Sequence, residues 1–526
     1  MSTITRGIGA AAAVALLGLS LAACASSGEE AGSSESAAPL AAVDGGSLVY
    51  ASDVQPITGG LDPYLASAFA NMNATVQIYE PLLAKDADGT IIPWLAESWE
   101  QVDDLTYTFT LRDGVTFSDG SPLTVEDVIF SIESMRASAA GAANFATLGE
   151  VTALDDSTVQ ITTVAPDATL INVLAYRGSA IVSKAWYEAA TEEERQQTAM
   201  GTGPFVLDTW TDQVSMTFTA NESYWGEAPS VDTLEFDFIG DENARAAQLR
   251  QGSGTDMAWF RDPTQVSSLE EEGYTVGQNA ATRSLTMYIN ATDGPLADVK
   301  VRQAVSKAMD RQALIDFAMG GLAEPSLVVP AGDPWGIEPD ESTPNYTHDV
   351  DGAKALLAEA GETSPTIQLT YASDAAFALD VPMVEVLQQQ LAEAGITLEL
   401  VGKPWTEVLQ SYIGGTWTDL LLVPGVYQPD PASYFSTVLT PGLPMATTVT
   451  AESPEVALYM QLRSTFDEAE RAEILAQLET AVAENVNVLV AYTGPQRYEV
   501  WGDTVTGYEV DPYTYREGLA ATAKTS

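Results

Sequence analysis

The sequence has almost no cysteine and almost no histidine: Cys24 and His348 are the single examples of each in 526 residues. One thiol cannot form an internal disulfide, and one imidazole excludes His-rich metal sites and Cys-His catalytic pairs. The phosphate-binding patterns GxxxxGK[ST] and GxGxxG and the hydrolase patterns GxSxG and HExxH are also missing. We therefore expect no metal and no cofactor. Hydrolysis by a pair of carboxylates is not excluded, because the chain has 74 acidic residues.

Positive charge is scarce as well. Lysine and arginine together number 22, and the formal net charge is −52. A surface of this sign repels nucleic acid and anionic lipid headgroups, so neither is an expected partner. The acidic residues form no long run, which indicates that they are spread over the whole surface. We interpret this acidity as solubility in an outward-facing environment rather than as a device for capturing a ligand.

Only the N-terminus carries a long apolar run. Residues Ile8 to Leu21 follow a single basic residue, Arg6, and are too few to span a bilayer comfortably, which is typical of a secretory signal at 1–23. The sequence Leu21-Ala22-Ala23-Cys24 resembles the bacterial lipobox, in which the cysteine is acylated and becomes the new N-terminus. We expect Cys24 to carry lipid and to hold the protein on the outer face of a membrane, on a Gram-positive surface or on the periplasmic side. The alternative is an ordinary signal peptide with a chance cysteine.

A flexible stalk is expected over 24–46. From Ala25 to Gly46 the chain is mostly Ala, Ser, Gly and Glu without an aromatic residue, so it cannot bury enough surface to offset the entropy of ordering. The remainder exceeds what one hydrophobic core usually serves, which predicts two or three domains.

The folded body reads as mixed α and β. Alternation predicts a strand at 107–111, and Thr124 to Asp127 form a capping box that begins a helix. Asp298 is expected to cap a helix that ends at Gly320-Gly321. Strand 366–371, helix 381–394 and strand 396–401 predict a βαβ unit with a parallel crossover. Further strands are expected at 47–51 and 419–423.

Several motifs then occur in order along nearly the whole body. They closely resemble the signature of the family 5 extracellular solute-binding proteins, the receptors of peptide/nickel-type ABC importers. The matching stretches are Tyr79-Glu80-Pro81-Leu82-Leu83, Pro93-Trp94-Leu95-Ala96-Glu97-Ser98-Trp99, Phe109 to Val128, Gly201-Thr202-Gly203-Pro204-Phe205, Asn221 with Tyr224-Trp225-Gly226, Val301-Arg302-Gln303-Ala304 with Asp310-Arg311, and Ala353-Lys354 with Leu356 to Gly361.

This resemblance implies an α/β fold of the periplasmic-binding-protein-like class II, with two lobes, three domains and a ligand cleft between the lobes. The implied domains are a discontinuous domain I of lobe 1 at 47–78, 200–285 and 493–522, an inserted domain II of lobe 1 at 79–199, and domain III, which forms lobe 2, at 286–492.

The implied function is that of an importer receptor and not of an enzyme. A monomer captures a small solute between two closing lobes and delivers it to the permease and ATPase subunits of an ABC transporter. An oligopeptide or similarly sized solute is the leading expectation, and an oligosaccharide or opine-like solute is the alternative. From another class, the alternative is a secreted carboxylate-pair hydrolase on a lipoprotein anchor.

The expected ligand contacts are mostly aromatic. Where the family's peptide receptors carry an aspartate for the peptide's α-ammonium group, this chain has uncharged residues, which weakens the case for a peptide with a free amine. Asp430, Asp419 and Glu407 are possible substitutes. Trp335 is expected on a mobile surface loop. The candidate ligand-binding residues are Trp259, Trp405, Trp417, Tyr427, Val426 and Gln428. For the aromatic ones, burial in an ordinary hydrophobic core is the alternative.

Overall fold

The computed structural model describes residues 42–43, 45–53, 55–56, 59–65, 69–138, 141–142, 144–176, 178–252, 254–280, 283–374, 380–495, 497–511 and 518–525. The expected signal segment, Cys24 and most of the expected stalk lie outside these ranges. Contacts divide the chain into residues 1–40 and 41–526, and every element below belongs to the second unit. Within the described ranges, none of the helices combines the length and the apolar character needed to cross a bilayer.

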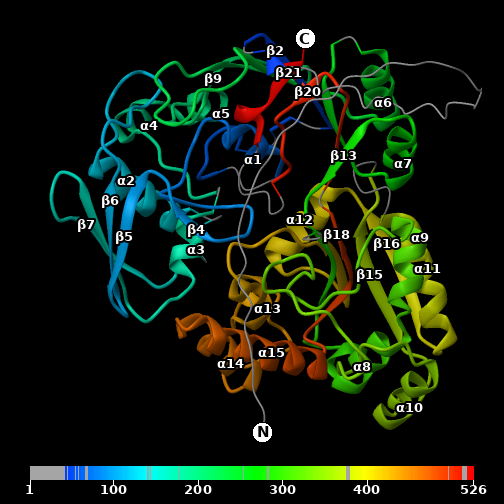
Figure 1. Cartoon of the computed structure of the whole chain (residues 1–526). Coiled ribbons are helices and arrows are strands. Elements are labelled where there is room, and N and C mark those ends of the chain that lie inside the picture. Colours follow the sequence, from blue (N-terminus) through cyan, green and yellow to red (C-terminus); the bar gives the residue numbers. More distant parts are fainter. Residues whose placement is uncertain are drawn as a thin grey trace, which may run out of the picture. The chain divides into compact units, whose positions relative to one another are not determined.

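A seven-stranded sheet gathers strands from three separate parts of the sequence (Figure 1). Its core strands β2, β11 and β12 are parallel, and β2 confirms the strand expected at 47–51. Helices α6 (Glu242–Gln251) and α7 (Pro263–Glu271) pack against β12. The strands, in spatial order, are β13 (Thr275–Gln278), β19 (Tyr498–Trp501), β12 (Met257–Phe260), β2 (Ser47–Ser52), β11 (Thr233–Phe238), β10 (Ser215–Ala220) and β9 (Phe205–Thr211).

Residues 79–199 contain a four-stranded antiparallel sheet of their own, in the order β5 (Ala96–Asp103), β6 (Thr106–Leu111), β8 (Thr158–Thr163), β7 (Leu148–Ala153). The alternation predicted for β6 is confirmed, because Tyr107, Phe109 and Leu111 are buried. Helix α2 (Val125–Ala137) begins at the predicted capping box, with the Asp127 carboxylate accepting from the Thr124 backbone N–H at 2.9 Å. A hairpin, β3 (Leu83–Lys85) with β4 (Ile91–Pro93), and helices α3 (Leu170–Leu174), α4 (Lys184–Ala189) and α5 (Glu192–Gln197) complete this part.

A five-stranded sheet lies between residues 283 and 494. The predicted βαβ unit is confirmed: β15 is followed by α11 (Asp380–Glu393) and by β16, which pairs parallel to β15. The strand expected at 419–423 is β17, also parallel to β15. In spatial order the strands are β16 (Thr397–Lys403), β15 (Thr366–Ala372), β17 (Leu420–Pro424), β14 (Arg283–Ile289) and β18 (Val488–Gly494).

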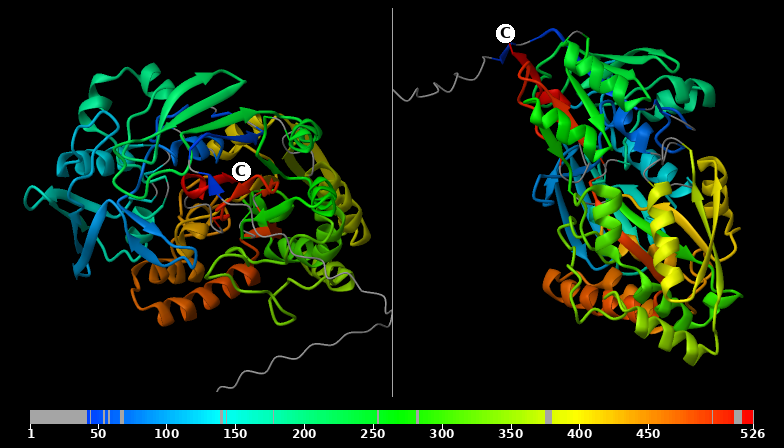
Figure 2. Two further views of the ribbon diagram at one scale, coloured as in Figure 1. Left: turned by 45° about the horizontal axis from the view of Figure 1, so that its top comes forward. Right: turned by 90° about the vertical axis from the view of Figure 1, so that its right-hand side faces the viewer.

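Each face of this sheet is apolar and is buried by helices, so the sheet has a separate apolar cluster on either side. The two longest helices after β17, α14 and α15, run side by side and are orange in Figures 1 and 2. The helices are α8 (Val299–Ala308), α9 (Arg311–Met319), α10 (Val350–Ala360), α11, α12 (Trp405–Gly414), α13 (Ser436–Leu439), α14 (Pro454–Ser464) and α15 (Glu468–Asn485).

The helix expected from Asp298 to Gly320 is wrong as a single element. Asp298 does cap α8, but the helix ends at Ala308, and a new helix, α9, begins at Arg311. Asp310 breaks the run because its carboxylate accepts from the Ala313 N–H at 3.0 Å, which makes it the N-cap of α9. Gly320 then ends α9 in the left-handed conformation, at φ +55°.

The signature motifs near the N-terminus converge on one buried carboxylate, that of Glu80. One of its oxygens accepts from the Trp94 indole N–H at 2.8 Å and from the Tyr224 hydroxyl at 2.9 Å. The other accepts from the Thr202 hydroxyl at 2.7 Å and from the Trp225 indole N–H at 2.8 Å. Motifs that are up to 145 residues apart are therefore held together by a single side chain, which gives these motif residues a structural role.

Two short connections join the seven-stranded and five-stranded sheets. Residues 279–282 lead from β13 to β14, and residues 495–497 lead from β18 to β19. Strand β14 begins before residue 286 and β18 continues past residue 492, so each extends across a domain boundary expected from the sequence. The division into three domains stays a prediction.

Candidate functional site

The connections leave the five-stranded sheet at the edge where its parallel strands end. Strands β15, β16 and β17 are parallel and share this edge. Strand β14 begins there, because Leu285 pairs with Pro424, the last residue of β17. Strand β18 ends there, because Gly494 pairs with Arg283.

The two connections also meet the seven-stranded sheet at the edge where its parallel strands end. Phe260, the last residue of β12, pairs with Tyr498, the first residue of β19, and Tyr498 also pairs with Gln278, the last residue of β13. Both connections therefore run between the carboxyl edges of the two sets of parallel strands. Ligands of open α/β sheets bind outside the carboxyl ends of the strands, so the segments that follow these ends form the candidate site.

Trp405 follows the carboxyl end of β16. It is the first residue of α12, its backbone N–H donates to the Asp374 carboxylate at 2.9 Å, and its half-buried ring packs on one of the apolar clusters of the sheet. Val426 and Gln428 follow the end of β17 in a loop, where Val426 is exposed and Gln428 is half-buried. Three of the predicted residues thus lie at one edge of the sheet, after the ends of β16 and β17, which flank β15.

Trp417 lies at the other edge of the sheet. It precedes β17, its backbone carbonyl accepts from the Asn290 side chain at 2.9 Å, and its ring is buried in the apolar cluster. Helix α12 has 10 residues and is therefore about 15 Å long, which separates Trp417 from Trp405. Trp417 therefore packs in the core away from the carboxyl edge, which is the alternative given for it from the sequence.

Trp259 is also a core residue, although it lies on β12 near the carboxyl edge. It is 1% exposed and belongs to the large apolar cluster of the seven-stranded sheet. The guanidinium groups of Arg261 and Arg497 lie over its ring at 5.4 and 5.3 Å. Arg261, which directly follows β12, also pairs with Asp53, which directly follows β2, at 3.2 Å. Polar groups that sequence reasoning missed therefore occupy this edge.

Tyr427 points toward residues 79–199. Its hydroxyl lies 3.4 Å from the Lys85 ammonium group, which donates to the Pro429 carbonyl at 2.8 Å. Burial lowers the pKa of Lys85 to about 8, and the nearby Asp430 and Asp333 oppose that shift. No local pattern marks this contact, because 342 residues separate Lys85 from Tyr427.

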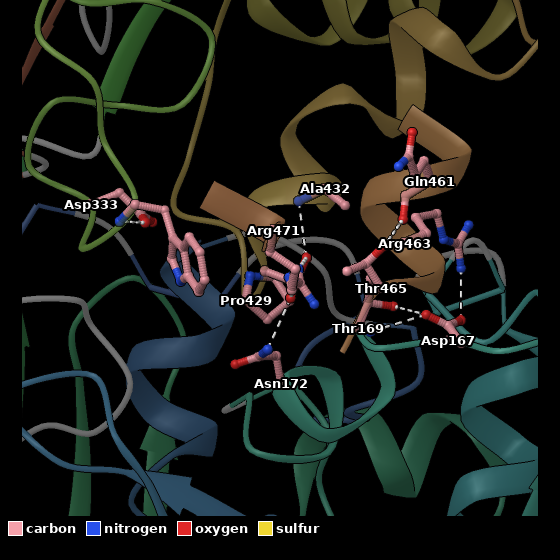
Figure 3. A network of polar contacts seen from close by, with 12 residues as sticks. Asp167, Thr169, Asn172, Asp333, Pro429, Ala432, Gln461, Arg463, Thr465 and Arg471 are labelled. Atoms are coloured by element: carbon pink, nitrogen blue, oxygen red, sulfur yellow. Dashed lines mark hydrogen bonds and ion pairs between the residues drawn. The ribbon is translucent and has the colours of Figure 1, made fainter. Parts of the chain in front are cut away.

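Asp430 is unavailable as an anchor for a ligand amine. Both of its carboxylate oxygens accept from the Arg471 guanidinium at 2.8 Å, and one also accepts from the Asn172 amide at 2.8 Å (Figure 3). Of the other two substitutes, Asp419 is buried and accepts from the Gln368 N–H at 2.8 Å before β17 begins, at the far edge. Glu407 is exposed in the first turn of α12, beside Trp405.

Arg463 and Asp167 form a further contact between residues 286–492 and residues 79–199. The Arg463 guanidinium on α14 donates to the Asp167 carboxylate at 2.8 Å, and the Arg463 carbonyl accepts from the Ala168 N–H at 2.7 Å (Figure 3). The Asp167 side chain is 1% exposed. Together with Lys85 and Asn172, these contacts form what we call the bridge between residues 79–199 and residues 286–492.

The expectation for Trp335 is wrong. Its ring is half-buried against the apolar cluster and lies 5.5 Å from the Arg471 guanidinium. Asp333 holds this segment, because its carboxylate accepts from the Trp335 N–H at 2.9 Å and from the Tyr434 hydroxyl at 3.0 Å. Burial raises the pKa of Asp333 to about 6. A glycine- and proline-rich stretch predicted a mobile loop, but side-chain contacts that are remote in sequence fix it.

The described part of the chain contains no group of three or more His, Cys, Asp or Glu residues placed to hold a metal ion. His348 lies 3.8 Å from the Asp310 carboxylate and is partly exposed, just before α10.

Glu479 on α15 predicts a pH dependence of stability. Its carboxylate accepts from the backbone N–H groups of Val328 and Val329 at 3.2 and 2.8 Å, and burial raises its pKa to about 7. The unfolded chain has an ordinary pKa of about 4.3 for this group, so between these values the folded state binds more protons. The contribution of Glu479 to stability is therefore complete at low pH and is lost as the pH rises through 7, with a slope of at most about 1.4 kcal/mol per pH unit.

Urea denaturation at pH 5 and pH 8 measures the contribution of Glu479 to the pH dependence of stability. The difference in unfolding free energy between the two pH values is expected to be smaller in Glu479→Gln than in the wild type, while the exposed Glu270→Gln control keeps the wild-type difference. An unchanged difference in Glu479→Gln would contradict the assignment.

Comparisons with known proteins agree with the fold. The model of the bacterial extracellular solute-binding proteins, family 5 Middle, matches residues 90–443. The dipeptide-binding protein of Escherichia coli (strain K12) is 28% identical over 520 residues, which cover 90% of this chain and 94% of that protein. The PBP AgaA from A.tumefacien R10, solved in complex with agropinic acid, is 25% identical with a TM-score of 0.79, over 91% of this chain and 99% of that one.

The ABC transporter-associated periplasmic binding protein DppA from Helicobacter pylori, solved with the peptide STSA, has a TM-score of 0.77 at 20% identity, over 92% of this chain and 99% of that one. These likenesses confirm the two-lobed, class II α/β fold expected from the sequence. The family and these relatives are solute-binding proteins and not enzymes, so carboxylate-pair hydrolysis is set aside. The chain belongs to the bacterial extracellular solute-binding proteins, family 5.

Proposed function

We propose that this protein is the lipid-anchored, extracytoplasmic receptor of an ABC importer, and that it captures an oligopeptide or similarly sized solute between two closing lobes and delivers it to the permease. In this proposal, acylation of Cys24 anchors the protein to the membrane, and residues 24–46 are the stalk that links the anchor to the folded body. Trp405, Val426 and Gln428 on one carboxyl edge, and Arg261, which follows β12 on the other, are the proposed ligand contacts.

The bridge is the observation that supports the proposed closing of the two lobes. Lys85, Asp167 and Asn172 lie in the inserted part of the chain, and their partners lie in the part that holds the five-stranded sheet. Phe466, between α14 and α15, also packs against the large apolar cluster of the other half. A solute that touches both halves stabilises the state in which they meet. A transporter can distinguish that state from the open one.

The choice of solute follows from charge. The loop at 425–428 has no acidic residue, and Asp430 is already paired with Arg471. A peptide with a free α-ammonium group would lack a buried counter-charge there, which costs binding free energy. The named relatives bind a dipeptide, the peptide STSA and agropinic acid. We therefore place blocked peptides and uncharged oligopeptides first, and oligosaccharides or opine-like solutes second.

Thermal-shift screening tests this proposal. The mature chain is mixed with pools of free-amine peptides, N-acetylated peptides and neutral oligosaccharides, and its melting temperature is recorded. Ligand at 100 times its dissociation constant stabilises the folded state by about 2.7 kcal/mol, which produces a measurable rise. We expect a rise with at least one pool, larger for acetylated peptides than for free-amine ones. If no pool raises the melting temperature, the receptor proposal fails.

A further inference from the structure

Strand β14 has two chemically different faces, and both are buried. Leu285, Met287 and Ile289 point into one apolar cluster of the five-stranded sheet. Ser284 and Thr286 point to the opposite face, at 6% and 7% exposure, with their hydroxyl oxygens 2.9 Å apart. A hydroxyl group costs free energy when it is buried without hydrogen-bond partners, so two in succession on a central strand are unusual in a face that packs only on apolar side chains.

A cavity of about 110 Å³ lies over this hydroxyl-bearing face. Its floor is formed by β14 together with Val488 and Val490 on the neighbouring strand β18. Its other walls come from α12 and from the segment around α13. The hydroxyl-bearing residues on its walls include Ser284, Thr286, Tyr288, Ser433, Ser436 and Thr437.

No Asp, Glu, Lys or Arg is among the described residues that line this cavity. A dry apolar cavity of about 150 Å³ can hold a benzene ring, so this volume suits a group somewhat smaller than that. Hydroxyl groups both donate and accept hydrogen bonds, and they rotate to suit a partner. The walls can therefore satisfy an uncharged polar group, while a charged group would enter without a counter-ion.

The cavity is continuous with the candidate site. Val426 and Gln428, which follow the carboxyl end of β17, also line it. Val426 is 41% exposed, so this part of the wall is at the surface. Gly425 closes the loop onto the floor, where a Cβ atom would come within 2.1 Å of the Ser284 hydroxyl oxygen.

We propose that this cavity is a subsite that receives one uncharged arm of the solute, an arm that carries a hydroxyl or amide group. This proposal rests on the proposed receptor function and narrows the class of solute. The solute has a neutral hydrogen-bonding arm no larger than a small ring. Solutes with a charged arm at that position bind more weakly. Such an arm is a hydroxylated or amide side chain of a peptide, or a hydroxylated edge of a sugar.

A matched ligand series distinguishes these sources. N-acetylated alanine tripeptides carry threonine, valine, aspartate or lysine at each position in turn, and maltotriose represents the sugars. Affinities are measured by calorimetry on the wild type, on Thr286→Val from the floor and on Thr437→Val from the opposite wall. Thr370→Val is the control, because Thr370 is a buried threonine of the same sheet, on β15, that does not line the cavity.

At one position, the wild type is expected to bind the threonine peptide about three- to tenfold more tightly than the valine peptide, which is the effect of one hydrogen bond. Thr286→Val and Thr437→Val each reduce this ratio toward one, while Thr370→Val preserves it. If maltotriose alone binds, and the two cavity variants weaken it by a similar factor, the arm is a sugar edge.

The two proposals fail in different ways. If solutes bind but both cavity variants keep every wild-type affinity, or if the aspartate or lysine peptide binds best at every position, the subsite is wrong and the receptor function stands. If nothing binds to the wild type, both are wrong. Melting temperatures of the unliganded variants within the range of Thr370→Val exclude misfolding as the cause of a lost preference.

Discussion

Replacing Trp259 with alanine is expected to lower the free energy of unfolding by about 3–5 kcal/mol, since it removes a fully buried ring and leaves a cavity. Trp405→Ala is expected to cost about 1 kcal/mol, because its ring is half-buried, and to lose most of the stabilisation given by a binding solute. Urea denaturation measures the loss of stability in each variant, and the ligand-induced rise in melting temperature measures the response of Trp405→Ala to solute.

Trp99→Ala is the matched control, because Trp99 is another half-buried tryptophan and lies on β5, in the inserted part of the chain. It should lose a similar small amount of stability and keep the full response to solute. If Trp405→Ala responds to solute as Trp99→Ala does, then Trp405 is a packing residue and the site at the carboxyl edge is wrong.

The second large effect is expected at Arg471. Its guanidinium is the only charged hydrogen-bond donor to the Asp430 carboxylate among the described residues, and the two side chains are 5% and 0% exposed. In Arg471→Met the carboxylate stays buried without its counter-charge, which costs about 3–5 kcal/mol of unfolding free energy. Chemical denaturation measures this loss.

Two further variants show whether charge is the cause. In Asp430→Asn/Arg471→Met the buried charge is removed, while an amide oxygen can still accept from the Ala432 N–H, so part of the stability should return. Arg250→Met breaks the exposed pair with Glu272, whose side chains are 36% and 41% exposed, and should cost less than about 1 kcal/mol. A loss in Arg471→Met no larger than in Arg250→Met would disprove the argument.

Local patterns in the sequence predicted the elements that depend on local physics. The alternation at 107–111, the capping box at Thr124 and the βαβ unit from 366 to 401 all correspond to observed elements. The helix expected from Asp298 was too long because its end was placed at Gly320-Gly321, although aspartate is a strong N-cap residue and Asp310 could have suggested the break. The family resemblance, rather than any periodicity, gave the fold.

The candidate site was predicted less well, because it depends on contacts between remote residues. Trp405 and the loop at 426–428 lie at the same edge of the sheet, after the ends of β16 and β17, as a parallel sheet implies. The helix between Trp405 and Trp417 could have shown from its length alone that both cannot touch one small ligand. No local signal marked Lys85 or Asp167, whose partners lie some 300 residues further along, at separations of 344 and 296.

The bridge also has a bearing on how the protein would handle several different cargoes. Its hydrogen bonds and ion pair involve protein groups alone, so in the proposed cycle they set how often the empty receptor is shut. The apparent dissociation constant of every cargo is scaled by that same fraction. Substitutions at Arg463 or Asp167, which lie outside the proposed ligand contacts, would then adjust retention and release for all cargoes together.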